Sequence, residues 1–354
     1  MNTTNTRRLT RSVILAGCFL AGAVLVLARC GGSGAVLHVY AWADYFKPDL
    51  VARFEKEQDC RVVIDTFDSN EAMYAKLKAG AGGYDILTPT SYMVSLMNSQ
   101  VMIQRLDRRR LPNLAHVDPE YLKLAVDPAM DHSAPYMVVN TVIAYLRGKV
   151  SAFVPSWSMF DRQDLRGRMT MLNDMRETIG AGLKFLGHSI NTTDAGELAA
   201  AEAIVVRWKK NIAKFENEQY KTGLASGEFL VVQGYSGDIL QVQKENPDVA
   251  FVVPREGTVI SVDDLVIPVG APQPVLAHAF INFWHDPAVA AENTTFLRYL
   301  CPNKDAYPLL GKDLRENPGV FLDPEVRARS EIIAELGDAN ALYLKVWDEI
   351  KAAR

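Results

Sequence analysis

The chain has 354 residues, of which 49% are hydrophobic and 23% are charged, and its formal net charge is −4. This composition is ordinary for a globular protein, and the length is sufficient for two core-forming domains. Residues 1–30 contain four arginines and no acidic residue, so the rest of the chain carries a formal charge of 34 − 42 = −8. An acidic protein of this kind is unsuited to a nucleic-acid partner and is suited to a cationic ligand.

Residues 1–30 have the layout of an export signal. Arginines precede an apolar run from Val13 to Leu27, which at about 15 residues is shorter than the roughly 20 that a membrane-spanning helix needs. Cys30 follows an apolar core of suitable length and is itself followed by the glycine-rich residues 31–35, which we interpret as a flexible tether. We therefore expect lipidation at Cys30, with Cys18 as the alternative, and a protein held to the outer side of a membrane by this lipid anchor.

Strands and helices alternate from residue 36 onward. Runs of apolar and β-branched residues predict strands, and apolar residues at helical spacing predict helices between them. Proline suits the first turn of the first helix, Ser69 or Asn70 can cap the second, and a glycine cluster follows it. The predicted strands cover residues 36–42, 61–67 and 84–89, and the predicted helices cover residues 48–57 and 69–77.

The same alternation resumes beyond residue 135. Further strands are predicted at residues 137–145, 168–172, 229–233, 250–253 and 265–268, with helical stretches between them. Helices are also predicted at residues 275–284, 287–299 and 340–353. This order predicts an α/β fold with two lobes, each a mostly parallel sheet flanked by helices.

Acidic and aromatic residues gather where the predicted strands end. In open α/β sheets, ligands bind outside the carboxyl ends of the strands, so these positions are candidates for a binding site. Aromatic rings can cover methylene groups and attract cations, and carboxylates accept charged hydrogen bonds. The pattern therefore predicts a site for a flexible alkyl chain with ammonium groups. The segments concerned are residues 42–45, 89–92, 173–174 and 234–235, and residues 261–264 before the last predicted strand.

Each of these residues also has a purely structural interpretation. Asp174 and Glu177 have the spacing of a helix capping box. Trp42 and Tyr45 could be half-buried core residues at a strand end, and the acidic pair Asp263 and Asp264 could simply be solvated in a loop. Sequence alone leaves both interpretations open.

The motifs of common enzymes are missing from the sequence. The six histidines lack a metal-binding spacing, and there is no Gly-x-Ser-x-Gly elbow, no phosphate-binding loop and no Cys-x-x-Cys pair. We therefore expect no catalysis, no cofactor and no metal. A disulfide between Cys60 and Cys301 cannot be inferred from sequence, and buried thiols are the alternative.

Residues 36–354 resemble the spermidine/putrescine-binding proteins of bacterial polyamine transporters. The resemblance is carried by residues 69–78, by residues 84–87, and by residues 254–257 leading into 263–268. It implies a two-lobed periplasmic binding protein, in the periplasm or on the surface of a bacterial cell, that delivers a polyamine to an ABC-transporter permease and works as a monomer. The implied lobes are residues 36–140 with 264–308 and residues 141–263 with 309–354. The hinge is expected where strands cross, near residues 137–141, near residues 263–265 and after residue 299.

The resemblance also implies which residues bind the ligand. They come from the four strand ends, from Glu177 three residues beyond Asp174, from the segment 261–264 and from the end of the predicted helix 287–299. The implied set is Trp42, Ala43, Asp44, Tyr45, Thr90, Ser91, Tyr92, Asp174, Glu177, Tyr235, Ser261, Asp263 and Tyr299.

Several positions depart from the family pattern. Tyr235 replaces a cleft tryptophan of the family, Ser261 stands where the spermidine binder has tryptophan, and Ala43 stands where that binder has threonine. A family glutamine has no clear counterpart around residues 333–338. The choice between spermidine, putrescine and another small cation, such as agmatine or a cationic amino acid, therefore stays open. A polyamine sensor that signals to a membrane protein is the alternative to a transport component.

Overall fold

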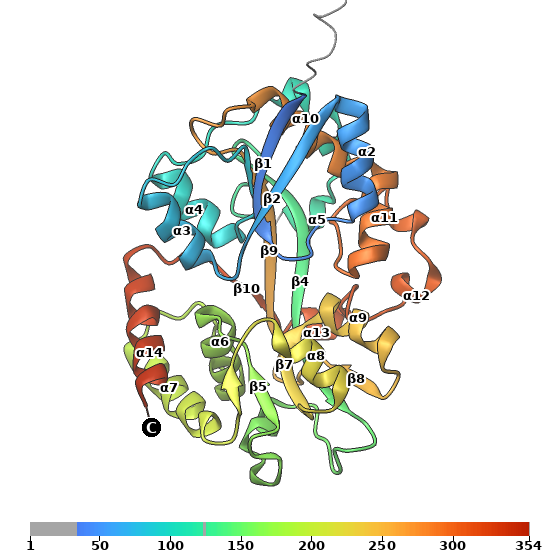
Figure 1. Ribbon diagram of the computed structural model, residues 1–354. Helices are drawn as coiled ribbons and strands as arrows, with labels where there is room; N and C mark the ends of the chain where they lie inside the picture. The colour runs from blue at the N-terminus through green and yellow to red at the C-terminus, as the bar shows by residue number, and fades with distance from the viewer. Residues whose placement is uncertain (1–33, 123–124, 354) are drawn as a thin grey trace, which may run out of the picture.

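The computed structural model describes residues 34–122 and 125–353, which form two lobes joined by crossing strands (Figure 1). The predicted signal 1–30, both candidate lipidation sites, Cys18 and Cys30, and residues 31–33 of the predicted tether lie outside the described residues. Within the described residues, every helix is too short or too polar to cross a bilayer.

The upper lobe in Figure 1 begins with a parallel sheet. Its first strand pairs in parallel with the next two strands of the chain, one on each side. The helices predicted at 48–57 and 69–77 begin and end within a residue of their observed bounds. The strands are β1 (Ala35–Trp42), β2 (Cys60–Phe67) and β3 (Ile86–Leu87). The helices are α2 (Pro48–Gln58), α3 (Asn70–Lys78), α4 (Ser91–Ser99), α5 (Pro119–Leu122), α10 (Pro274–Trp284), α11 (Pro287–Leu297) and α12 (Lys312–Arg315).

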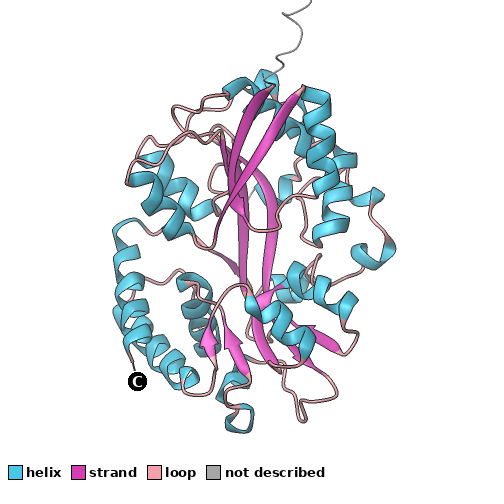
Figure 2. Ribbon diagram, viewed as in Figure 1, coloured by secondary structure: helices cyan, strands magenta, loops and turns pink. Residues whose placement is uncertain are grey.

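The lower lobe repeats the plan with β5 as its central parallel strand, paired with β6 and β7. Helices flank this smaller sheet, and the last helix of the chain packs beside α7 (Figures 1 and 2). The strands are β5 (Met169–Met171), β6 (Lys214–Phe215), β7 (Val231–Tyr235) and β8 (Val249–Val252). The helices are α6 (Met175–Leu186), α7 (Ala195–Lys209), α8 (Gln219–Ser226), α9 (Ser236–Glu245) and α14 (Asn340–Ala352), and α13 (Pro324–Arg327) lies near the crossing.

Two long strands run between the lobes (Figure 2). β4 (Ser133–Leu146) is buried along nearly its whole length and pairs antiparallel with β9 (Val259–Val266) through its first half. Its second half pairs with β7 and β8 of the lower lobe. Because β4 belongs to the sheets of both lobes, the strand order is continuous: β2-β1-β3-β9-β4-β7-β5-β6.

The strand predicted at residues 265–268 is wrong in its bounds, since β9 starts six residues earlier at Val259. Asp263 and Asp264 therefore lie inside a strand, not in a loop before one. The polar side chains at residues 261, 263 and 264 concealed the strand in the sequence, because a strand pattern is recognised by its apolar residues. The strand predicted at 84–89 is likewise reduced to two residues, Ile86 and Leu87.

Each lobe has a core of its own, which explains how two halves of one chain can be stable units. Phe46, Phe280 and Trp284 pack together in the upper lobe, with ring centroids 4.9 to 5.6 Å apart. Phe160 and Trp208 pack at 5.9 Å in the lower lobe. Cys301 is buried and Cys60 half-buried, and both are free thiols.

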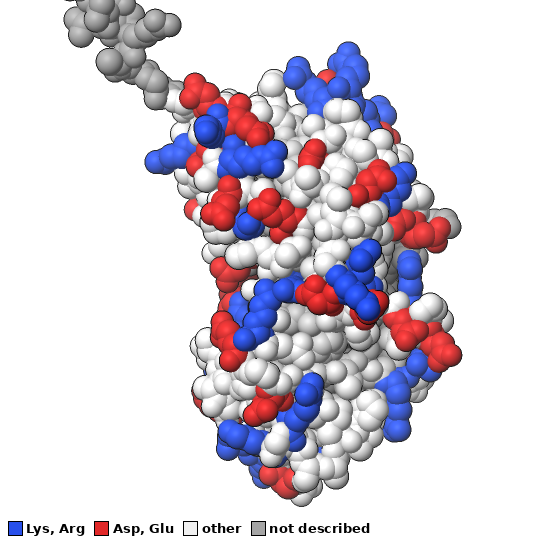
Figure 3. Space-filling model, turned by 90° about the vertical axis from the view of Figure 1, so that its right-hand side faces the viewer, with Lys and Arg blue, Asp and Glu red and all other residues white. Residues whose placement is uncertain are grey.

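The surface carries charges of both signs. On the face shown in Figure 3, lysines and arginines lie interspersed with aspartates and glutamates over both lobes. This face therefore lacks the continuous basic surface that proteins use to bind nucleic acid.

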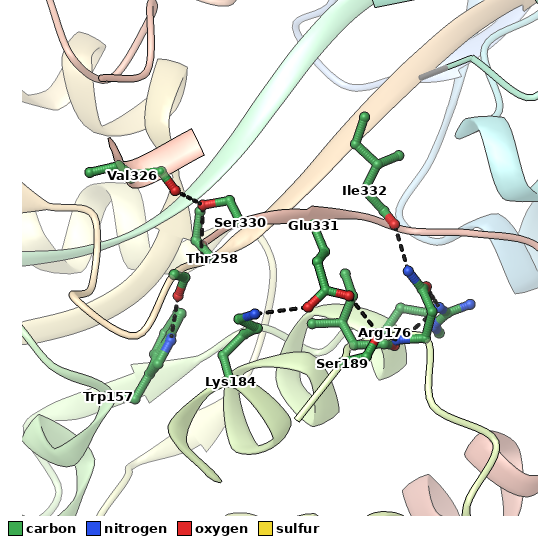
Figure 4. A network of polar contacts seen from close by, with 12 residues as sticks. Trp157, Arg176, Lys184, Ser189, Thr258, Val326, Ser330, Glu331 and Ile332 are labelled. Atoms are coloured by element: carbon green, nitrogen blue, oxygen red, sulfur yellow. Dashed lines mark hydrogen bonds and ion pairs between the residues drawn. The ribbon is translucent and has the colours of Figure 1, made fainter. Parts of the chain in front are cut away.

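A short third strand, β10 (Glu331–Ile332), lies at the crossing and pairs in parallel with β9. The Glu331 carboxylate accepts hydrogen bonds from Lys184 Nζ at 2.8 Å and Ser189 Oγ at 2.5 Å (Figure 4). Asn191 binds the backbone of Ile332 at 2.8 Å. Hydrogen bonds and an ion pair therefore connect the segment around β10 to α6 and to the loop that follows α6.

Candidate functional site

A cavity lies between the two lobes, and its volume is about 770 Å³ when the open space at its entrance is included. Twelve of the thirteen residues expected from the sequence line it, all except Ser91. They come from the ends of β1 and β7, from the starts of α4 and α6, from β9 and from the segment after α11. The expected residues in the lining are Trp42, Ala43, Asp44, Tyr45, Thr90, Tyr92, Asp174, Glu177, Tyr235, Ser261, Asp263 and Tyr299.

Ser91 lies outside the cavity lining. Its hydroxyl donates to Asp264 Oδ2 at 2.5 Å, and Ser91 and Asp264 are both 1% exposed. Asp264 is the neighbour of Asp263 in β9, and successive side chains of a strand point to opposite faces. Asp263 therefore points into the cavity and Asp264 points away from it, with Ser91 as its partner.

Asp263 is a buried carboxylate held by two hydroxyl groups. Thr90 Oγ1 donates to it at 2.7 Å, and the Tyr45 hydroxyl donates to its other oxygen. Burial raises the pKa of Asp263 to about 6, although both hydrogen bonds act in the opposite direction. It forms no ion pair with any described residue, so its charge is met only by neutral donors.

Glu177 is held in the same way by two other elements. Its carboxylate accepts from Thr141 Oγ1 of β4 at 2.5 Å and from Ser261 Oγ of β9 at 2.8 Å. Burial and the neighbouring Asp174 raise the pKa of Glu177 to about 8. A carboxyl group in this state takes up or releases its proton near neutral pH.

Asp174 caps α6 and also lines the cavity. Its Oδ1 accepts from the backbone N–H groups of Arg176 at 2.9 Å and Glu177 at 3.0 Å, so it caps α6. The reciprocal half of a capping box is absent, because the Glu177 side chain turns to Thr141 and Ser261. Burial and the charge of Glu71 raise the pKa of Asp174 to about 6. The Asp174 carboxylate thus caps α6 and at the same time forms part of the cavity wall.

Aromatic rings form the apolar part of the wall. Tyr45 packs edge-on against Tyr299, with ring centroids 6.3 Å apart, and Trp42 packs against Phe67 at 4.5 Å. The core interpretation of Trp42 and Tyr45 is therefore also partly right: both rings pack on neighbours and face the cavity. Tyr235 is within electrostatic reach of Asp174, Glu177 and Asp263.

The sequence analysis missed eight lining residues: Asp68, Asn70, Val139, Asn217, Glu218, Lys221, Asp238 and Ile333. Asp238 follows Tyr235 by three residues at the start of α9, so the strand-end rule could have found it. Glu218 directly precedes α8 and Lys221 lies in its first turn, and neither follows a predicted strand. No local signal marks them.

Besides the hydrogen bond from the Tyr299 hydroxyl to Asp238 Oδ1 at 2.6 Å, two further contacts join the lobes across the cavity. Asn217 Nδ2 of the lower lobe donates to the backbone oxygen of Asp68 of the upper lobe at 3.1 Å. Lys221 Nζ lies 3.9 Å from Asp44 Oδ2. The two lobes are therefore close together at the mouth of the cavity.

Known proteins resemble this chain along nearly its whole length. The sequence profile described as bacterial extracellular solute-binding protein matches residues 49–321. A putrescine/cadaverine-binding protein from Pseudomonas aeruginosa is 32% identical, covering 96% of this chain and 99% of that one. A putrescine-binding periplasmic protein from Escherichia coli is 33% identical, with 97% and 98% covered. A solved structure described as a putative spermidine/putrescine ABC transporter from Listeria monocytogenes has a TM-score of 0.86 at 31% identity and covers 91% of this chain and 100% of that one.

Proposed function

This chain belongs to the bacterial extracellular solute-binding protein family, and from that premise we propose that it captures a small polyamine between its lobes. The proposed cargo is putrescine or spermidine, and the proposed recipient is the permease of an ABC transporter. The names of the relatives support the cargo class, and the chemistry of the cavity supports it independently.

The observation that carries the proposal is a set of three buried carboxylates that form no ion pair with any described residue. Asp174, Glu177 and Asp263 line one cavity, and the charge of Arg176 lowers the pKa of Asp174 only against the larger effect of burial. Removing a charged carboxylate from water costs several kcal/mol unless an opposite charge compensates it. The amines of a polyamine are protonated at neutral pH, like the side chain of lysine. Such a guest would place a positive charge beside these three carboxyl groups and would favour their ionised forms.

The aromatic wall supports a guest with a hydrocarbon backbone. Tyr45, Tyr235, Tyr299 and Trp42 present rings to the same cavity as the carboxylates. Rings can cover methylene groups and attract ammonium groups by cation–π interaction. An anion would be repelled by the buried acids, and a neutral sugar would bring no charge to pair with them.

The crossing strands support a hinge mechanism. One lobe would bind the guest first, the other would close over it, and the closed form would dock on the permease. The predicted lobes, residues 36–140 with 264–308 and residues 141–263 with 309–354, remain a prediction of this mechanism. α12 departs from these bounds, because Leu314 lies in one hydrophobic cluster with Leu300 and Ala306 of the upper lobe. The contacts of β10 with α6 would make that strand move with the lower lobe.

Attachment to the membrane belongs to the same proposal. The leader and the tether would place the binding domain in the periplasm or on the cell surface, with Cys30 as the lipidated residue and the protein as a monomer. The Cys30→Ser variant is then expected in the soluble fraction, whereas Cys18→Ser stays with the membrane. The reverse distribution would assign the anchor to Cys18.

The test of the proposed function is a thermal-shift screen of the purified protein. The compounds are putrescine, spermidine, spermine, agmatine, arginine and a neutral sugar. A ligand at a thousandfold excess over its dissociation constant stabilises the folded state by about 4 kcal/mol, which is a plain shift in Tm. Putrescine or spermidine is expected to give that shift and the sugar none. If none of the amines raises the Tm, the proposal is overturned.

A further inference from the structure

The cavity contains a second group of acids, which we call the outer cluster: Asp44, Glu218 and Asp238. Unlike the inner cluster of Asp174, Glu177 and Asp263, the outer cluster holds a cation of the protein itself. The ammonium of Lys221 lies 2.8 Å from Glu218 Oε2, 3.9 Å from Asp44 Oδ2 and 4.0 Å from Asp238 Oδ2. The two clusters of one cavity therefore differ in whether their charge is already compensated.

Lys221 keeps its charge in this position. Burial lowers the pKa of Lys221, but the charges of Asp238, Glu218 and Asp44 outweigh that effect and hold it above its ordinary value. Its side chain is only 25% exposed, so the ammonium is directed at the acids and not at bulk water. A primary ammonium group on an alkyl chain is also what the end of a polyamine presents.

Asp238 is fixed in place independently of Lys221. Its Oδ2 accepts from the Tyr220 hydroxyl at 2.5 Å, and its Oδ1 accepts from the Tyr299 hydroxyl at 2.6 Å. The outer cluster would therefore keep a well-placed carboxylate if Lys221 lost its charge.

The two clusters are linked by a pair of rings. Tyr299 binds Asp238 of the outer cluster, and its ring lies 6.3 Å from that of Tyr45, which binds Asp263 of the inner cluster. A guest with ammonium groups in both clusters would have to extend along both rings. A short diamine can place its charge within the inner cluster alone.

We infer that Lys221 acts as a built-in occupant of the outer cluster and restricts the site to short diamines. This inference rests on the proposed function and narrows its substrate class. A longer guest brings a further ammonium to a place where Lys221 already stands, and two like charges at one acidic cluster repel each other. Spermidine therefore binds less tightly than putrescine, although it carries more charge into an acidic cavity.

The experiment is titration calorimetry on the full-length protein, purified after export, and on two variants. Lys221→Met removes the charge and keeps a side chain of similar length. Lys210→Met is the matched control, because Lys210 is exposed at the end of α7 and does not line the cavity. The ligands are putrescine, spermidine and diaminooctane, a diamine about as long as spermidine that has the same charge as putrescine.

In the unaltered protein, putrescine is expected to bind at least about tenfold more tightly than either longer ligand. Lys221→Met is expected to reduce that preference by about tenfold for both longer ligands, and Lys210→Met to leave it unchanged. Lys221→Met makes the cavity more negative, which should strengthen the binding of putrescine and diaminooctane equally, because the two have the same charge. A larger gain in affinity for diaminooctane than for putrescine therefore reports the length of the ligand.

The inference would be overturned if Lys221→Met binds amines and its preference for putrescine over diaminooctane differs by less than about twofold from that of the unaltered protein. The same holds if the unaltered protein prefers spermidine. The melting temperature without ligand checks folding, and Lys221→Gln repeats the test should the methionine variant be unstable. Binding of none of the three amines by the unaltered protein would instead refute the proposed function itself, and with it the inference.

Discussion

Ser261 of the crossing strand β9 donates a 2.8 Å hydrogen bond to the buried carboxylate of Glu177 at the start of α6. The Ser261 hydroxyl favours the ionised form of Glu177, against the effect of burial. The Glu177 carboxylate thereby connects β9 to the start of α6, and it lines the cavity.

The first prediction concerns pH. Burial raises the pKa of Glu177 from 4.5 to about 8 in the empty protein. The raised pKa means that Glu177 contributes stability below about pH 4.5 that is lost as the pH rises to about 8. A bound cation favours the ionised form, so binding releases a proton. The affinity for putrescine is expected to rise by about tenfold between pH 6 and pH 8, and calorimetry in buffers of different ionisation enthalpy should detect the proton.

Glu177→Gln is the matched variant for this prediction, since it keeps the shape and removes the titration. Its residual pH dependence should come from Asp174 and Asp263, whose pKa values are about 6, and should be complete near pH 7. An unaltered protein whose affinity is flat from pH 6 to pH 8 would contradict the role of Glu177.

The second prediction isolates the Ser261 hydrogen bond. This bond lowers the pKa of Glu177, against the effect of burial. Ser261→Ala should therefore move the midpoint of the pH-dependent gain in affinity upward. A net hydrogen bond to a charged group contributes about 1.5–3 kcal/mol, so the affinity at pH 7 should fall measurably. Thr222→Ala is the control, because Thr222 is exposed on α8. An unchanged midpoint would show that the contact has no electrostatic role.

The third prediction concerns Asp263, which we expect to contact an ammonium group directly. Replacement by asparagine keeps the partners Thr90 and Tyr45 but removes the charge. The loss of binding is expected to be about 2–4 kcal/mol for putrescine, because a buried cation would be left unpaired. Asp49→Asn is the control, since the Asp49 side chain is 85% exposed on α2. A loss of less than about tenfold in affinity would count against this assignment.

The fourth prediction separates the two roles of Asp174. Asparagine caps helices about as well as aspartate, so Asp174→Asn should keep the melting temperature while it weakens polyamine binding. Asp174→Ala also removes the acceptor for two backbone N–H groups of α6, which costs about 0.5–2 kcal/mol of the free energy of unfolding. Equal binding losses with equal stability in both variants would refute the capping role.

Local sequence was enough to predict most of the secondary structure and most of the cavity lining. The runs at 36–42 and 61–67 became β1 and β2 because apolar and β-branched residues gather there. The acids and rings at strand ends met at one cavity because the carboxyl ends of parallel strands lie on one side of a sheet. The same rule also selected Ser91, which is turned away from the cavity by its bond to Asp264.

The partners of the acids were decided by the tertiary structure alone. Tyr45 and Asp263 are separated by 218 positions, and Glu177 and Ser261 by 84, yet each pair shares a hydrogen bond. Lys221 was missed because a lysine on a short helix resembles a solvated surface residue until Asp44 of the other lobe is brought beside it. Sequence patterns report which face of an element is buried. Which charge meets which partner depends on how the two lobes close, because an electrostatic interaction is determined by distance and burial in space and not by separation along the chain.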